Sequence, residues 1–282
     1  MRWYYHQSPL LRHDSKLYTR PYILDTLHSL LVVEHPIDFN IYQNQIKFRS
    51  YGGLLSTHAY YVGEVEYHLV QYVVSKLKPN FIMFDIGAHH GTYTLIVAYE
   101  LKKRGWKGLI HSFEPDPFNF SLLQYNVEQN QLTDYVVLHN KGVSNLTGKE
   151  SFLVNTKENS DNMIGSTKTL LNQENQSEIY KQQELEVIKL DDFVGEISHV
   201  DMIKIDIQGG EYLALEGAKQ LIEQNKPICL VEAVQGWATT LKVENILGDY
   251  NYSIKAVDTK GMLCERDSSD VFISWDWVAI PK

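Results

Sequence analysis

The stretch FDIGAHHGTYTL, residues 84–95, decides the fold of this chain. Apolar residues lead into an acid, Asp85, which is followed two positions later by Gly87 and four positions after that by Gly91. Glycine tolerates backbone conformations that other residues avoid, so a glycine turn between a strand and a helix lets the chain approach a nucleotide closely. The stretch therefore predicts a strand–turn–helix unit that binds a nucleotide or a related cofactor.

Short apolar segments and helical patterns alternate from residue 81 onward, which is typical of a doubly wound α/β sheet. The near-continuous hydrophobicity of the first five segments indicates strands that are buried on both faces. The last two segments alternate more and are expected to close one edge in the antiparallel direction. The result is a mostly parallel, seven-stranded, Rossmann-like sheet with strands at 81–86, 108–114, 135–140, 200–206, 227–233, 252–258 and 270–280.

Helices are expected between these strands. Asp116 followed by Pro117 is typical of a helix N-cap with proline in the first turn. Residues 211–226 predict a helix that stops before Pro227. The adjacent acids of the segment LDDF, 190–193, are expected to cap or order a turn.

The chain divides into an N-terminal part, whose sequence pattern predicts few regular elements, and a cofactor-binding domain. Residues 1–78 predict an N-terminal helical or irregular cap, with a helix around 22–33, a short strand near QIKFRSY (45–51) and a helix that ends near Pro79. Residues 79–282 form the predicted domain. Within it, residues 155–186 are rich in Asn, Gln, Ser, Thr and Lys, and a long polar connection of this kind is typical of a lid, an acceptor-binding loop or a surface insertion.

Charge and cysteine content limit the partners and the compartment. The formal charge of −9 argues against a nucleic-acid backbone as the main partner. Two cysteines, Cys229 and Cys264, do not make a disulfide framework, and Cys229 lies in an apolar run that predicts a buried thiol. The first twenty residues lack an apolar signal-peptide core, and no apolar run is long enough to span a bilayer. We therefore expect a cytoplasmic protein.

The glycine spacing distinguishes between nucleotide classes. A dinucleotide of the NAD type needs glycine at positions 89 and 92, where this chain has His89 and Thr92. A phosphate loop of the Walker type also fails, because no G-K-[ST] follows. Glu114, at the end of the second strand and 23 residues beyond Gly91, is placed to accept hydrogen bonds from the two hydroxyls of a ribose. The remaining pattern of Asp85, Gly87 and Gly91 resembles the first motif of class I S-adenosylmethionine-dependent methyltransferases, whose cofactor has a ribose and no pyrophosphate.

Several ordered blocks together resemble the FkbM-type methyltransferases, a family of class I enzymes that use S-adenosylmethionine. The blocks are FDIGAHHGTYTL, FEPDP (113–117), LDDF, DMIKIDIQGGEYLALEGA (201–218) and ICLVE (228–232), and the resemblance covers about residues 81–233. The family implies methylation of hydroxyl oxygens, often on sugars or on polyketide-type natural products. We therefore expect an O-methyltransferase that acts on a small-molecule or glycan acceptor.

The resemblance also assigns site residues. The cofactor is expected to contact residues of the glycine loop, the ribose acid and the turn after the third strand, namely Asp85, Gly87, Ala88, His89, Gly91, Thr94, Glu114, Asn140 and Gly142. Lys204, Asp206, Gly209 and Glu211 match the family pattern K-x-D-x-E-G-x-E. The family usually has Asn where His89 stands and Glu where Gln208 stands. Gln208, Glu211 and Glu232 are expected on the acceptor side.

An alcohol must lose a proton when it is methylated, so a general base or a Lewis-acid metal helps. Asp206 is the preferred base, Lys204 lies on the same strand face and is expected to tune it, and His90 or His89 are alternative bases. The competing interpretation is that Lys204 and Glu211 form a structural ion pair. No metal motif is present, so dependence on a divalent metal stays open. Four aromatic residues are possible stacking groups for the acceptor: Tyr60, Tyr61, Trp237 and Trp275.

Two other classes of function remain as alternatives. A cofactor-binding partner subunit without catalysis is compatible with Gln208 and the polar insertion. A NAD-dependent dehydrogenase is disfavoured by the glycine spacing. The oligomeric state and the acceptor are not encoded in any motif of the sequence.

Overall fold

The computed structural model of the chain describes residues 36–51, 66–155, 163–164, 180–232, 237–258, 261–265 and 276–282. The helix expected at 22–33 and three of the four aromatic residues proposed for stacking, Tyr60, Tyr61 and Trp275, lie outside these ranges, as does the side chain of Trp237.

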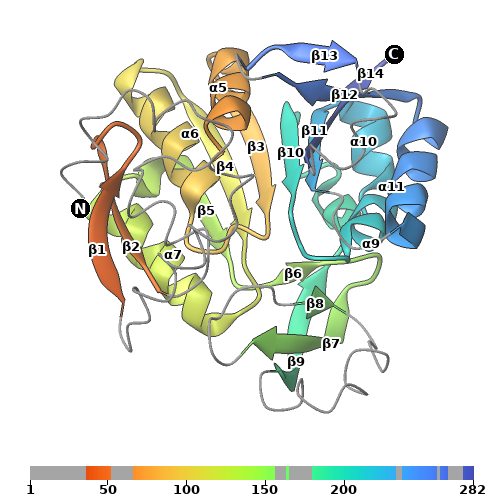
Figure 1. The fold of residues 1–282 in the computed structure, drawn as a ribbon, viewed down its shortest axis with the longest axis horizontal. Helices are drawn as coiled ribbons and strands as arrows, with labels where there is room; N and C mark the ends of the chain where they lie inside the picture. Colours follow the sequence, from red (N-terminus) through yellow and green to blue (C-terminus); the bar gives the residue numbers. More distant parts are fainter. Residues whose placement is uncertain are drawn as a thin grey trace, which may run out of the picture.

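A single eight-stranded sheet forms the centre of the molecule (Figure 1), with the strand order β13-β12-β14-β11-β10-β3-β4-β5. The five strands from β11 to β5 are parallel, whereas β14 pairs antiparallel with both β11 and β12. The bounds are β3 Phe81–Ile86, β4 Gly108–Phe113, β5 Val136–His139, β10 Met202–Ile205, β11 Ile228–Glu232, β12 Tyr252–Val257, β13 Leu263–Glu265 and β14 Asp276–Pro281. The expected mostly parallel sheet is confirmed, with β13 as a short additional strand at its edge.

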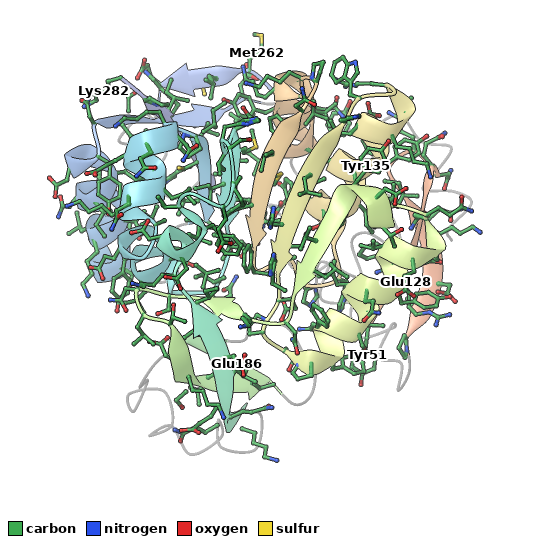
Figure 2. The ribbon with its side chains drawn as sticks, turned by 180° about the vertical axis from the view of Figure 1, so that it is seen from behind. Tyr51, Glu128, Tyr135, Glu186, Met262 and Lys282 are labelled. Carbon is green, nitrogen blue, oxygen red and sulfur yellow. The ribbon has the colours of Figure 1, made fainter. Side chains whose placement is uncertain are left out.

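Alternate residues of each central strand enter two separate hydrophobic clusters, one on each face of the sheet. On β3, Phe81 and Met83 belong to the first cluster, and Phe84 and Ile86 belong to the second. This is the consequence of side chains that alternate between faces on a strand that is buried on both sides. Helices α5 (Tyr67–Lys76), α6 (Thr92–Lys103) and α7 (Pro117–Gln129) cover the first face, and α9 (Glu211–Glu216), α10 (Lys219–Asn225) and α11 (Trp237–Asp249) cover the second (Figures 1 and 2).

Helix α7 begins at a side-chain N-cap. Asp116 accepts hydrogen bonds from the backbone N–H groups of Phe118 and Asn119, and Pro117 is the first residue of α7. The predicted N-cap is therefore confirmed. Cys229 is fully buried, as expected from its apolar neighbours.

The single helix expected at 211–226 is instead two helices, α9 and α10, that are separated at Gly217. The carbonyl of Gly217 accepts a hydrogen bond from the backbone N–H of Asp191, so it is turned away from the helix. The N–H of Leu221 donates to the Asp191 carboxylate at 2.9 Å, not to a helical carbonyl. The LDDF segment, now the 3-10 turn η3 (Leu190–Phe193), thus orders the junction and starts α10.

A second, four-stranded sheet lies beyond the edge at which the parallel strands end (Figure 1). Its strand order is β6-β9-β7-β8, with bounds β6 Gly142–Val143, β7 Gly148–Asn155, β8 Met163–Ile164 and β9 Tyr180–Ile188. The segment 155–186, which was expected to be a loop, therefore includes the last residue of β7, all of β8 and most of β9. Leu185 and Val187 of β9 pack on Phe152 and Val154 of β7, and this small apolar core was hidden by the polar composition around it.

The described elements of residues 1–78 are helix α5 and an antiparallel hairpin, β1 (Ile37–Ile41) and β2 (Ile46–Ser50). The buried hairpin residues Phe39, Ile41 and Phe48 share a hydrophobic cluster with the first face of the sheet. The strand expected near residues 45–51 is present, and the domain boundary at residue 78 stays a prediction. Within the described ranges, no helix is both long and apolar enough to cross a membrane.

Candidate active site

The turn between β3 and α6 is built by glycine at the point where it meets β10. Gly87 has φ +77°, and a Cβ atom on it would lie 1.9 Å from the backbone oxygen of Asp206. Only glycine fits this contact, because both the conformation and the space exclude a side chain. The N–H groups of Gly87 and Ala88 donate to the carbonyl of Phe113 at the end of β4. The glycine loop is thus fastened to both neighbouring strands.

Asp85 ties the strand to the first turn of α6. Its Oδ2 atom accepts hydrogen bonds from the backbone N–H of Thr94 at 3.1 Å and from the Thr94 hydroxyl at 2.6 Å. Its Oδ1 atom is buried and has no hydrogen-bond partner among the residues that the structure describes. A buried carboxylate oxygen without a donor is costly, so this atom is suited to a donor supplied by a ligand.

Glu114 holds the glycine loop from the second strand. Its two oxygens accept backbone hydrogen bonds at 2.9 Å, one from His89 and one from Asp116. Burial raises the pKa of Glu114 to about 8, although these two N–H groups favour its ionised form. The Asn119 side chain is a third donor to this carboxyl. A carboxylate has about four lone-pair sites, so a hydroxyl of a ribose can still be accepted.

The two histidines of the loop differ in their surroundings. His90 is fully buried, with Nδ1 2.8 Å from the Ser50 hydroxyl and Nε2 3.1 Å from the Asn119 side-chain oxygen. Burial, together with the neighbouring His89, holds the pKa of His90 well below its usual range. Both ring nitrogens are used to join hairpin strand β2 to α7, which disfavours His90 as a base. His89 is in the left-handed region at φ 51°, and its ring stacks on His90 with centroids 3.6 Å apart.

Asn140 and Gly142, expected near the cofactor adenine, form the turn after β5. Asn140 donates to the backbone oxygens of Glu114 and Pro115 at 2.9 and 3.2 Å. A Cβ atom on Gly142 would lie 2.9 Å from the Phe152 ring, so glycine lets β6 pass close to β7. Both residues therefore shape the backbone beside Glu114.

A buried charge cluster lies at the ends of β3 and β10. Lys204, which is directly opposite Asp85 in the parallel register, donates to Asp206 Oδ2 at 2.9 Å. Burial disfavours the ammonium charge of Lys204, but Asp206, Asp85 and Glu66 outweigh it and raise the lysine pKa. Burial also opposes the charge of Asp206, yet Lys204 and hydrogen bonds from neighbouring side chains hold the pKa of that carboxyl below its usual value. Such a carboxylate is a weak base, which disfavours the role expected of Asp206.

Two residues that contact this cluster, Glu66 and Tyr93, were not predicted as site residues from the sequence. Glu66, just before α5, accepts a hydrogen bond from the Tyr93 hydroxyl at 2.6 Å. The Tyr93 ring in turn lies 4.8 Å from the Lys204 ammonium, which is a cation–π contact. Desolvation raises the pKa of Glu66 against the attraction of Lys204. Glu66 is 138 positions from Lys204 in the sequence, so only the fold reveals their proximity.

The residues expected on the acceptor side lie next to this cluster. The Gln208 amide donates to Glu232 Oε2 at 3.0 Å and lies 3.4 Å from Asp206 Oδ1. Gln208 adopts the left-handed conformation with φ 52°. It therefore bridges two carboxyl groups where the family pattern has a third.

Glu211, at the start of α9, bonds to the loop before it and not to Lys204. Its Oε1 atom accepts a hydrogen bond from the N–H of Gly209 at 2.9 Å, and burial raises the pKa of its carboxyl. The lysine pairs with Asp206, so the Lys204–Glu211 ion pair is not formed. Within the described ranges, no group of three or more His, Cys, Asp or Glu side chains is arranged to hold a metal ion.

The family model described as "Methyltransferase FkbM domain" matches residues 85–254. A search of curated proteins finds no match.

Solved structures that are similar in part include a methyltransferase FkbM from Methylobacillus flagellatus KT, at 15% identity and a TM-score of 0.46 over 95% of this chain and 60% of that one. A precorrin-6y C5,15-methyltransferase from Geobacter metallireducens is 13% identical, with a TM-score of 0.42 over 77% of this chain and 88% of that one. The O-methyltransferase TomG from Streptomyces achromogenes is 10% identical, with a TM-score of 0.43 over 77% of this chain and 81% of that one. This chain thus spans about three-fifths of the Methylobacillus protein.

The family model covers the glycine loop, Glu114 and the charge cluster at β10 except Glu66, more than half of the chain in all. This chain therefore belongs to the FkbM methyltransferase family.

Proposed function

We propose that the protein is an S-adenosylmethionine-dependent O-methyltransferase that methylates a hydroxyl group of a sugar, glycan or natural-product acceptor. The observation that supports this most is the contact between the Gly87 loop and the end of β10, where Asp206, Gln208 and Glu232 gather carboxyl and amide groups. A cofactor held by the loop and an alcohol held by these groups would meet at the same strand ends.

The residues present fit the cofactor. Glu114 keeps room for a ribose hydroxyl beside its three donors. The buried Oδ1 atom of Asp85, at the end of β3, has no hydrogen-bond partner among the described residues and suits a donor from the cofactor. The turn at Gly87 and Gly91, with φ +77° and +97°, brings backbone close to this position. When bound, S-adenosylmethionine supplies an activated methyl group on a sulfonium centre.

The protein's own residues then have two tasks. They must hold the acceptor oxygen in line with the methyl group at a short distance, which is the main source of rate in such a displacement. They must also receive the hydroxyl proton. Among the described residues of the β10 cluster, carboxyl groups outnumber the single ammonium group, so an uncharged acceptor suits the site better than an anionic one.

Two measurements test the proposal. Calorimetric titration with S-adenosylmethionine, with NAD as the comparison, tests the cofactor. Release of S-adenosylhomocysteine is then assayed with methyl glycosides, free hexoses and phenolic alcohols, with and without a chelator. Tight cofactor binding without turnover on any acceptor would favour the non-catalytic partner subunit. Binding of NAD but not of S-adenosylmethionine would refute the proposal.

A further inference from the structure

Two asparagine side chains of α7 attach the β1–β2 hairpin to the helix. Asn126 accepts a hydrogen bond from the backbone N–H of Arg49 at 2.7 Å and donates to the carbonyl of the same residue at 2.8 Å. Asn130, one helical turn later, makes the same pair of bonds with Lys47, at 3.0 and 2.7 Å. The two amides thus bond to the edge of β2 as a neighbouring strand would, and β2 lies alongside α7 (Figure 1).

Asn126 also reaches the glycine loop. Its side-chain nitrogen donates a second hydrogen bond, to the carbonyl of His90 at 2.8 Å. The side-chain nitrogen of Asn130 instead gives its second bond to the carbonyl of Asn126, inside the same helix. An amide nitrogen has two protons, so Asn126 uses one for the hairpin and one for the loop. The Asn126 side chain is fully buried, where carbonyl groups that lose their donor are not compensated by water.

The ring of His90 is held by the same two elements. Its Nδ1 atom lies 2.8 Å from the hydroxyl of Ser50, the last residue of β2, and its Nε2 atom lies 3.1 Å from the side-chain oxygen of Asn119 on α7. An amide oxygen can only accept, so Nε2 carries the ring proton and Nδ1 accepts from the Ser50 hydroxyl. The backbone carbonyl and both ring nitrogens of His90 are therefore bonded to the hairpin or to α7.

The glycine loop has a backbone that needs such support. His89 and Gly91, on either side of His90, are in the left-handed region with φ 51° and 97°. This region is unfavourable for a residue with a side chain, and such a conformation persists where surrounding contacts hold it. The N–H of His89 donates to Glu114, the expected ribose acid, at 2.9 Å. The bonds at His90 therefore fix a segment that adjoins the expected cofactor site.

We propose that Asn126 is a positioning residue for cofactor binding, which acts through the His90 carbonyl and makes the β1–β2 hairpin part of the support that keeps the glycine loop in its binding conformation. This inference rests on the proposed use of S-adenosylmethionine. Asn126 acts without touching the cofactor. When a binding loop is ordered for only a fraction of the time, the apparent Kd rises by the inverse of that fraction.

Cofactor affinity is the first test. Calorimetric titration of the full-length protein with S-adenosylmethionine should give a Kd roughly 10–100-fold higher in Asn126→Ala, as for a loop that is ordered in about 1–10% of the molecules. Asn130→Ala is the matched control, because it removes the equivalent bonds to β2 and leaves the His90 carbonyl bonded. Its Kd should stay within about threefold of the wild-type value. Equal weakening in the two variants would assign the effect to hairpin docking and overturn the role of the bond to His90.

Amide hydrogen exchange in the cofactor-free protein is the second test. A variant that only lowers global stability loses protection at all slowly exchanging amides together, whereas local opening affects one segment. We expect Asn126→Ala to lower the protection of the His89 and Gly91 amides by roughly 10–100-fold more than that of the central strands. An equal loss everywhere would make Asn126 an ordinary stabilising residue and refute the proposal. The ¹⁵N signals of the wild-type His90 ring should show the Nε2–H tautomer, and an Nδ1–H ring would contradict the bonds on which the proposal rests.

Ser50→Ala is a milder change that keeps the proposal testable if Asn126→Ala does not fold. It removes one hydroxyl from the end of β2 and with it the donor to Nδ1 of His90. The protection of the loop amides and the cofactor affinity should each fall by roughly 3–10-fold, which corresponds to the loss of one hydrogen bond. Unchanged protection and affinity in this variant would overturn the coupling between hairpin and loop.

The outcomes separate this inference from the proposed function. If the wild type binds no S-adenosylmethionine, the proposed function fails, and hydrogen exchange in the cofactor-free protein still decides whether Asn126 holds the loop. If the wild type binds the cofactor and Asn126→Ala keeps both its affinity and its loop protection, the function stands and the role of Asn126 is refuted. A selective loss in Asn126→Ala, with Asn130→Ala close to wild type, supports the assignment.

Discussion

Lys204→Met is the change that tests the buried charge cluster most directly. Methionine keeps the length of the side chain beside the Tyr93 ring but removes the ammonium group. At 2.9 Å and an effective dielectric constant of about 20, the attraction between Lys204 and Asp206 is about 6 kcal/mol. Part of this offsets the cost of burying the lysine, so we expect a loss of about 3–5 kcal/mol in the free energy of unfolding at neutral pH.

The loss should depend on pH, because the groups left behind are carboxyl groups. The pKa values of Asp85 and Glu66 are already raised by desolvation, and without Lys204 they rise further. A group with a raised folded pKa contributes stability that is present below its unfolded pKa and is lost as the pH rises through its folded pKa. The deficit of the variant should therefore be small near pH 5 and largest near pH 8.

Thermal and urea unfolding of wild type and variant measure this deficit. A loss of 3–5 kcal/mol corresponds to a fall in Tm of roughly 10 °C for a domain of this size. The control is Lys219→Met, which removes the same charge from an exposed position and should change stability by less than about 0.5 kcal/mol. A deficit below about 1 kcal/mol, or one that is equal at pH 5 and pH 8, would refute the assignment of Lys204 as the counter-ion of these carboxylates.

Four further predictions concern the glycine loop, Glu114, the buried His90 and the insertion. Gly87→Ala should abolish cofactor binding or folding, because its Cβ would lie 1.9 Å from a backbone oxygen; Gly105→Ala, also at positive φ but with open space, should cost only about 1–2 kcal/mol in chemical unfolding. Affinity for S-adenosylmethionine should rise between about pH 6 and pH 8 as Glu114 ionises, with proton release seen by calorimetry in buffers of different ionisation enthalpy; Glu114→Ala should weaken binding by about 1–3 kcal/mol and remove this dependence. His90→Leu should lower the free energy of unfolding by about 2–4 kcal/mol, because Ser50 and Asn119 lose buried partners, and cofactor-bound kcat should survive if His90 is structural. Replacing residues 165–179 by a short Gly-Ser linker should raise the acceptor KM and leave cofactor affinity intact, which steady-state kinetics can check; unchanged kinetics would make the insertion dispensable.

The sequence by itself determined the features that depend on neighbours along the chain. The acid and the two glycines at 85–91 predicted the strand–turn–helix unit, because the chain must turn sharply there whatever surrounds it. The Asp116–Pro117 helix cap could also be predicted, because it depends only on residues that are adjacent in the chain. Apolar runs located all seven expected strands, and the order of the blocks was sufficient to recognise the family.

The tertiary structure alone decided which charged groups meet. Lys204 pairs with Asp206 and faces Glu66, whereas the sequence pattern allowed a pair with Glu211 equally well. Asp191 interrupts a continuous helical pattern because its N–H donates to the carbonyl of Gly217 and its carboxylate accepts from the N–H of Leu221. Apart from the Lys204–Asp206 bond, these outcomes rest on contacts between residues 26 to 138 positions apart. The desolvation of a buried group and its choice of partner are set by everything packed around it, so no local pattern encodes them.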